Sequence, residues 1–153
     1  MQISLCKGES RHRMVITHSD GVEIVNDLGP NLPFHDLAHY VVESNLEYDD
    51  GLFGNLAKGY SIPDLSSKEV IKILPEQIMI SEVASRALSG IVTGSVRLDQ
   101  FNLIVQEELD DMDSDYSFSI STIVIEKMVR DYEGLIKEWQ KLPTGGSLEF
   151  RWP

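Results

Sequence analysis

Apolar and polar residues alternate in the first part of the chain, which is the pattern of β-strands with one buried face. The alternation predicts strands over residues 2–7, 11–18 and 22–26. Asp20-Gly21 lies between the second and the third, and an Asp-Gly pair between two β-rich runs predicts a hairpin with a type I′ turn.

The same alternation returns at residues 148–152, where apolar residues alternate with polar ones. A lone terminal strand must pair with the edge of a sheet, and the N-terminal strands offer such an edge. We therefore expect an antiparallel sheet of three or four strands, covered on one face by helices.

Between these strands, apolar residues recur at three- and four-residue steps, which predicts helices. The predicted helices and helical turns cover residues 33–45, 51–60, 76–94, 98–109 and 120–142. Residues 62–67 are predicted as a loop. Ser66 or Ser67 can cap the short helical piece that follows and that Pro75 ends, and Ser66 with Glu69 has the spacing of a capping box. The helix that begins at residue 76 has apolar residues on more than one side, so we expect it to be buried at the centre of the fold.

These elements predict an α+β fold, in which a small antiparallel sheet of N-terminal strands plus the C-terminal strand packs against several helices. With 153 residues, the chain is expected to form a single globular domain over residues 1–153.

The charge of the chain argues against nucleic acid and membrane partners. The sequence has 25 acidic against 13 basic residues, and the net charge of -12 repels phosphate backbones and anionic lipids. Arg11, His12 and Arg13 form the only basic cluster, which is small for a nucleic-acid footprint.

Cys6 is the only cysteine, which excludes a disulfide within the chain and suits a reducing compartment. The N-terminal residues lack the basic region and the long apolar run of a signal peptide, and no run reaches the roughly 18 apolar residues of a membrane span. We therefore expect a cytoplasmic protein. Cys6 in a predicted strand is typical of a small buried hydrophobe rather than of a nucleophile.

A stripe of potential metal ligands lies on the predicted helix at residues 33–45. His35, His39 and Glu43 follow one another at four-residue steps, so they share one side of the helix at the border of its apolar face. Two histidines with this spacing can bind one divalent ion such as zinc. Asp36 stands where the zinc-protease motif has glutamate, and we expect it to orient a histidine.

The stripe alone does not complete a ligand set. Glu82 is a further candidate, because it is an acid on the mostly apolar central helix. His18 and the acids of residues 47–50 are alternatives. In the competing interpretation, Glu43 forms a hydrogen bond with His39 across one turn, and no metal binds.

A second group of acids begins at Asp111-Met112-Asp113-Ser114-Asp115, which opens like a calcium-binding loop. The sequence places Tyr116 and Thr122 where that loop needs glycine and glutamate. A solvated acidic loop is therefore the better interpretation.

The segment HDLAHYVVE and the following GLFGNLAKG resemble a group of small uncharacterised bacterial proteins with an LPxHDLxHYVVE-like helix and a GxFGxxAxG turn. The resemblance covers residues 32–59 and, more weakly, the terminal GGSLEFRWP. It implies no activity, but it singles out His35, Asp36, His39 and Glu43.

Because no complete catalytic set is apparent, the preferred hypothesis is a binding or interaction module with a protein or small-molecule partner. The alternative is a metal-dependent, hydrolase-like enzyme that uses His35, His39 and Glu43. A homodimer that pairs through an exposed edge strand is a third hypothesis.

Overall fold

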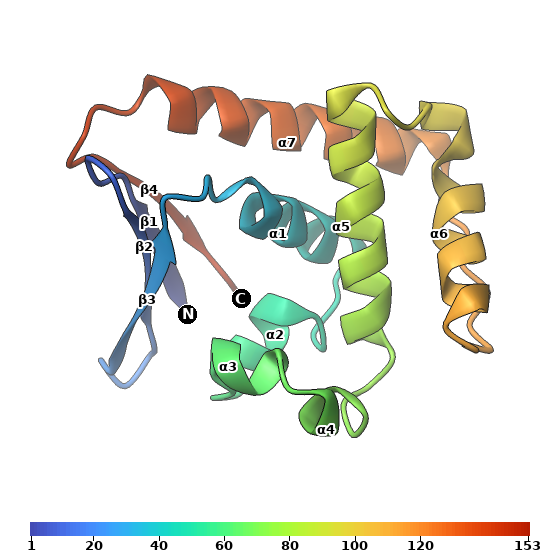
Figure 1. The fold of residues 1–153 in the computed structure, drawn as a ribbon, viewed down its shortest axis with the longest axis horizontal. Coiled ribbons are helices and arrows are strands. Elements are labelled where there is room, and N and C mark those ends of the chain that lie inside the picture. Colours follow the sequence, from blue (N-terminus) through green and yellow to red (C-terminus); the bar gives the residue numbers. More distant parts are fainter.

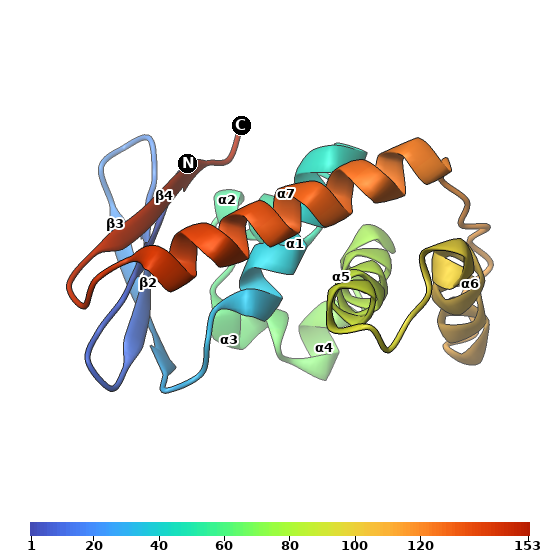
Figure 2. The same cartoon turned by 90° about the horizontal axis from the view of Figure 1, so that it is seen from above.

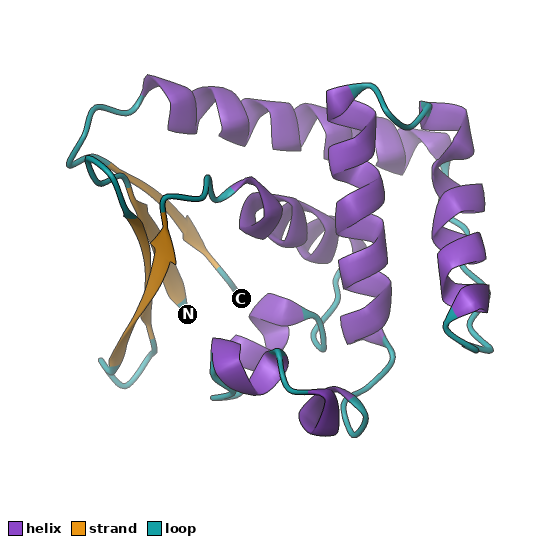
Figure 3. Cartoon of the chain, viewed as in Figure 1, coloured by secondary structure: helices purple, strands orange, loops and turns teal.

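A four-stranded antiparallel sheet lies at one end of the molecule in the computed structural model, which describes all 153 residues (Figures 1 and 3). The strands are β1 (Gln2–Cys6), β2 (His12–Thr17), β3 (Glu23–Gly29) and β4 (Ser147–Arg151), in the order β3-β2-β1-β4. β4 pairs with β1, so the predicted fold class and the predicted place of the terminal strand are confirmed.

One face of the sheet supplies part of the core. Ile3, Leu5, Met14 and Ile16 alternate with partly or fully exposed neighbours along β1 and β2, and none of the four is accessible to solvent. The alternation of the sequence therefore sets which face turns inward.

The turn between β2 and β3 differs from the prediction. Three residues separate His18 from Val22, whose carbonyl accepts a hydrogen bond from the His18 amide, and Gly21 alone in this turn has a positive φ, of 86°. The predicted hairpin is confirmed, because β2 and β3 pair antiparallel. A type I′ turn needs positive φ at both central residues, so the predicted turn type is wrong.

Seven α-helices and one short 3₁₀ helix lie between β3 and β4. They are α1 (Phe34–Leu46), α2 (Leu52–Ala57), α3 (Ile62–Leu65), α4 (Lys68–Ile71), α5 (Gln77–Thr93), η1 (Leu98–Gln100), α6 (Phe101–Asp111) and α7 (Thr122–Lys141).

The prediction of a loop over residues 62–67 is wrong, because α3 occupies its first four residues. Ser61 starts α3 with a capping box: its hydroxyl accepts from the amide of Asp64, whose carboxylate accepts from the amide of Ser61. Of the two serines predicted as caps, Ser67 holds the N-cap position of α4, so the predicted capping box of Ser66 with Glu69 is wrong.

The helix α5 is central, as predicted, and α1 and α6 lie on either side of it (Figure 1). It is buried on several faces through Ile78, Ile80, Val83, Ala84, Ala87 and Leu88. The long helix α7 runs across the bundle and connects the α6 end with the sheet (Figure 2).

Aromatic side chains join the helices to the sheet. Tyr40 of α1 lies 4.2 Å from Phe150 of β4, and Phe53 of α2 stacks on Trp152 at 5.8 Å, both measured between ring centroids. Through these contacts the sheet fixes α1 and α2, the two elements that build the site described below.

The edge strands of the sheet are β3 and β4. Val25 of β3 is 57% exposed and lies between Glu23 and Asp27 on the outer face of the strand. The homodimer that pairs through an edge strand stays a prediction.

None of the helices combines the length and the apolar composition that a membrane crossing requires.

Candidate metal centre

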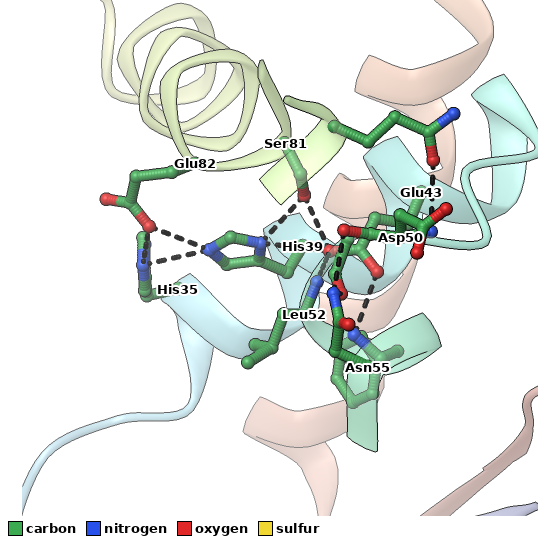
Figure 4. Close-up of polar contacts among 11 residues, drawn as sticks. His35, His39, Glu43, Asp50, Leu52, Asn55, Ser81 and Glu82 are labelled. Atoms are coloured by element: carbon green, nitrogen blue, oxygen red, sulfur yellow. Dashed lines mark hydrogen bonds and ion pairs between the residues drawn. The ribbon is translucent and has the colours of Figure 1, made fainter. Parts of the chain in front are cut away.

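Three potential ligand atoms meet where α1 approaches α5 (Figure 4). His35 and His39 stand on successive turns of α1, and their Nε2 atoms lie 3.2 Å apart. Oε2 of Glu82, from α5, lies 3.0 Å from Nε2 of His39 and 3.3 Å from Nε2 of His35. The structure thus brings together three of the residues singled out in the sequence.

The spacing of these atoms suits one metal ion. In a tetrahedral site with metal–ligand bonds of about 2.0–2.1 Å, neighbouring ligand atoms lie about 3.3 Å apart. The three separations of 3.0, 3.2 and 3.3 Å are close to one face of such a tetrahedron. An ion just above the plane of these three atoms would bind two imidazoles and one carboxylate.

Nδ1, the other ring nitrogen of His39, has two polar partners, Glu43 and Ser81. Nδ1 lies 3.1 Å from Oε1 of Glu43 and 3.0 Å from Oγ of Ser81, and the Ser81 hydroxyl donates to Glu43 over 2.5 Å. Nδ1 therefore faces two acceptors and carries a proton, which leaves the lone pair of the neutral ring on Nε2. Metal-binding histidines are typically oriented in this way by a carboxylate.

Glu43 is completely buried, and both of its carboxylate oxygens are occupied. Oε1 accepts from the amide of Leu52 at 2.7 Å, and Oε2 accepts from the amide of Phe53 at 2.9 Å. The carboxylate lies on the Nδ1 side of His39, away from the triangle of ligand atoms (Figure 4). Glu43, predicted as a ligand, thus contacts the ring nitrogen of His39 that faces away from His35 and Glu82.

The chain reaches this arrangement through a tight turn between α1 and α2. Glu47 ends α1 in the left-handed region, with φ 55°. The side-chain amide of Asn55 then donates to the carbonyls of Asp50 and Gly51, both at 2.8 Å, and fixes the turn. As a result, the first amides of α2 point at Glu43.

Gly51 is required by this close approach. A Cβ atom at Gly51 would lie 2.5 and 2.6 Å from the two carboxylate oxygens of Glu43, and closer still to its Cδ. The GLFG segment and the histidine helix are therefore parts of one structural unit.

Arg86, on the same helix as Glu82, contacts Glu82 and connects it to Glu108 of α6. Nε of Arg86 lies 3.4 Å from Oε1 of Glu82, and Nη2 of Arg86 lies 2.7 Å from Glu108. Arg86 thus contacts one carboxylate oxygen of Glu82, while the other oxygen faces the histidines. Glu82 and Arg86 are four residues apart on α5, so this pair follows from helix geometry.

The electrostatics of the cluster favour a bound cation. Burial alone would lower the pKa of His39, but hydrogen bonds with Glu43 and Glu82 raise that pKa to about 9. Hydrogen bonds with His35 and His39 hold the pKa of Glu82 well below its usual range. The site therefore stabilises positive charge between these side chains, either as a proton on His39 or as a metal ion.

The ligand atoms open onto a cavity of about 460 Å³. Its size is that of small-molecule sites, and seven of its twelve lining residues are apolar. Asp36 also lines the cavity, and burial raises the pKa of its carboxyl group. Asp36 forms no hydrogen bond with His35 or His39, whose partners are those given above.

Other candidates from the sequence lie outside the cluster. His18 stands at the β2–β3 turn, and Asp50 pairs with Lys58. Sequence reasoning did not identify Ser81, which is completely buried, or the amides of α2 as partners of the site. The available signal was the adjacent polar pair Ser81-Glu82 on a mostly apolar helix.

The resemblance of residues 32–59 to a group of bacterial proteins stays a prediction. In comparisons with protein-family models, curated proteins and solved structures, nothing was found that matches this chain.

Proposed function

We propose that the protein binds one divalent metal ion, zinc, through His35 Nε2, His39 Nε2 and Glu82 Oε2. The observation that carries this proposal is the triangle of ligand atoms with sides of 3.0, 3.2 and 3.3 Å. The buried Glu43–His39 contact supports it, because it holds the imidazole in the tautomer that a metal needs.

The proposed site belongs to the catalytic class of zinc sites. Structural zinc sites have four protein ligands, whereas catalytic sites have three and keep a position for water or substrate. Here three side chains converge, and the cavity lies beside them. Two histidines and one glutamate are also the ligands of known zinc hydrolases. We therefore propose a metal-dependent hydrolase, in which the ion activates a water molecule and polarises a carbonyl group.

The binding module, which is the preferred hypothesis from the sequence, is here the second candidate function, and the apolar cavity favours it. Both functions place a small molecule in the cavity. They differ in turnover, since a binding module releases its ligand unchanged.

Zinc titration against a chromogenic chelator tests the proposed site directly. We expect metal-free wild type to take up one zinc per chain, and the double variant His35→Ala/His39→Ala to lose at least 100-fold in affinity. His18→Ala is the matched control, because it removes a histidine outside the cluster, and it should bind like wild type. Zinc at 100 times its Kd should also stabilise the wild type by about 2.7 kcal/mol.

The proposal fails if wild type binds no stoichiometric zinc, or if the double variant binds zinc as tightly as the control. The hydrolase function is tested next, by comparing ester hydrolysis by the zinc-loaded wild type and by Glu82→Gln. If zinc binds but no ester or amide is turned over, the binding module is the better description.

A further inference from the structure

The cavity beside the proposed metal site has an apolar wall built from several elements. Leu52 comes from α2, Leu65 from α3, Ile71 from α4, and Ile78 from α5. Leu65 and Ile78 are each 8% exposed, so part of this wall is well buried. An apolar group of a ligand that packs against this wall leaves water, which lowers the free energy of the bound state.

The charged groups of the cavity are two acids and the histidines of the metal cluster. The acids are Asp36 and Glu82, and neither lysine nor arginine is among the lining residues. A phosphate or carboxylate group on a ligand would therefore find no cation in the cavity except the metal ion. Burying such a charged group without a partner would weaken the binding of the ligand. The chain as a whole, with its net charge of -12, also repels anions.

We infer that the site takes uncharged esters or amides with an apolar acyl chain, with the carbonyl oxygen at the metal ion and the chain along Leu52, Leu65 and Ile78. This inference rests on the proposed metal site. In the reaction, the oxygen of a water molecule bonds to the carbonyl carbon, and the bond from that carbon to the leaving oxygen or nitrogen breaks. One proton of the water goes to the leaving group, and the products are an acid and an alcohol or amine.

Straight-chain hydroxamic acids are suitable probes, because the hydroxamate group binds zinc and the chain can be lengthened. We expect the affinity of the zinc-loaded protein to rise about fourfold for each methylene from acetohydroxamic to octanohydroxamic acid, as for methylenes that become buried. Suberic acid monohydroxamate has a similar length but ends in a carboxylate, and it should bind at least tenfold more weakly than octanohydroxamic acid.

Two variants separate the cavity from the metal site. Ile71→Trp fills the cavity without changing a ligand, so it should retain zinc and acetohydroxamic acid but lose the dependence on chain length. Ile123→Trp is the matched control, because Ile123 of α7 is 75% exposed and is not among the residues that line the cavity. It should behave like wild type.

Zinc content measured on the same samples distinguishes the two proposals. If no zinc is retained, the metal site and the substrate inference fall together. If zinc is retained and acetohydroxamic acid binds, the inference alone is overturned by affinities that do not change with chain length. Equal or tighter binding of the carboxylate-ended probe overturns it as well.

Discussion

Replacing Gly51 by alanine would test whether the turn before α2 and the histidine helix form one unit. The added Cβ would lie 2.5 and 2.6 Å from the carboxylate oxygens of Glu43, which is too close for non-bonded atoms. A flexible side chain at the surface could swing away, but Glu43 is completely buried. Its carboxylate is also held by the amides of Leu52 and Phe53 and by the side chains of Ser81 and His39.

The expected loss in the free energy of unfolding follows from these contacts. A hydrogen bond to a charged group contributes about 1.5–3 kcal/mol, so a shift that breaks two of the four would destabilise the protein by about 3–6 kcal/mol. His39 would also lose its orienting partner, and a loss of this kind typically lowers metal affinity by about 10- to 100-fold. The free energy of unfolding is measured by urea denaturation of the metal-free protein, and zinc affinity by chelator competition.

Gly134→Ala is the matched control. Gly134 lies in the middle of α7, and a Cβ there would meet no atom within 4 Å. Alanine favours helix over glycine by up to about 1 kcal/mol, so this variant should be as stable as wild type or slightly more stable. If Gly51→Ala is as stable as Gly134→Ala and binds zinc equally well, the Glu43 carboxylate is not fixed by these four contacts.

Three further predictions concern other parts of the molecule. The metal-free protein should lose stability as the pH rises from 6.5 to 9, by at most about 1.4 kcal/mol per pH unit, because folding raises the pKa of His39 to about 9 and thus favours its protonated form. Urea denaturation across this range should show no such slope for His39→Gln, and a flat wild-type profile would contradict the prediction. Lys7→Met should cost about 1–2 kcal/mol, since the Lys7 ammonium donates to three carbonyls at the C-terminal end of α7, whereas Lys72→Met at an exposed position should change little. Thermal unfolding tests this pair, and equal melting temperatures would refute the capping role. Gly54→Ala should destabilise the protein by at least about 2 kcal/mol, because a Cβ there would overlap the backbone carbonyl of Asp49, and wild-type stability in the same assay would show that the turn can adapt.

Much of the fold could be predicted from the sequence, because periodicity reports which residues turn inward. The strands, the central α5 and the long α7 all follow from alternation or from three- and four-residue steps. The short α3 was missed, since four residues are too few to show a period. Its capping box at Ser61 and Asp64, with Pro63 in the first turn, was the signal available.

The site was partly predictable for the same reason. Helix geometry places His35, His39 and Glu43 in one row, and that row is present. Periodicity gives the side of the helix but not which ring nitrogen faces which neighbour. His39 uses its two nitrogens in opposite directions: Nε2 faces His35 and Glu82, and Nδ1 faces Glu43 (Figure 4). The other partners of Glu43 come from α2 and α5, which only the tertiary fold brings close.

X-ray absorption at the zinc edge, on protein loaded with one equivalent of zinc, identifies the atoms that bind the ion. We expect two imidazole nitrogens and at least one oxygen at about 2.0–2.1 Å from the ion, with no sulfur. Failure to retain zinc through gel filtration would contradict this expectation. So would a shell of oxygens without imidazole, or a sulfur at about 2.3 Å, which would place Cys6 rather than the histidine helix at the metal.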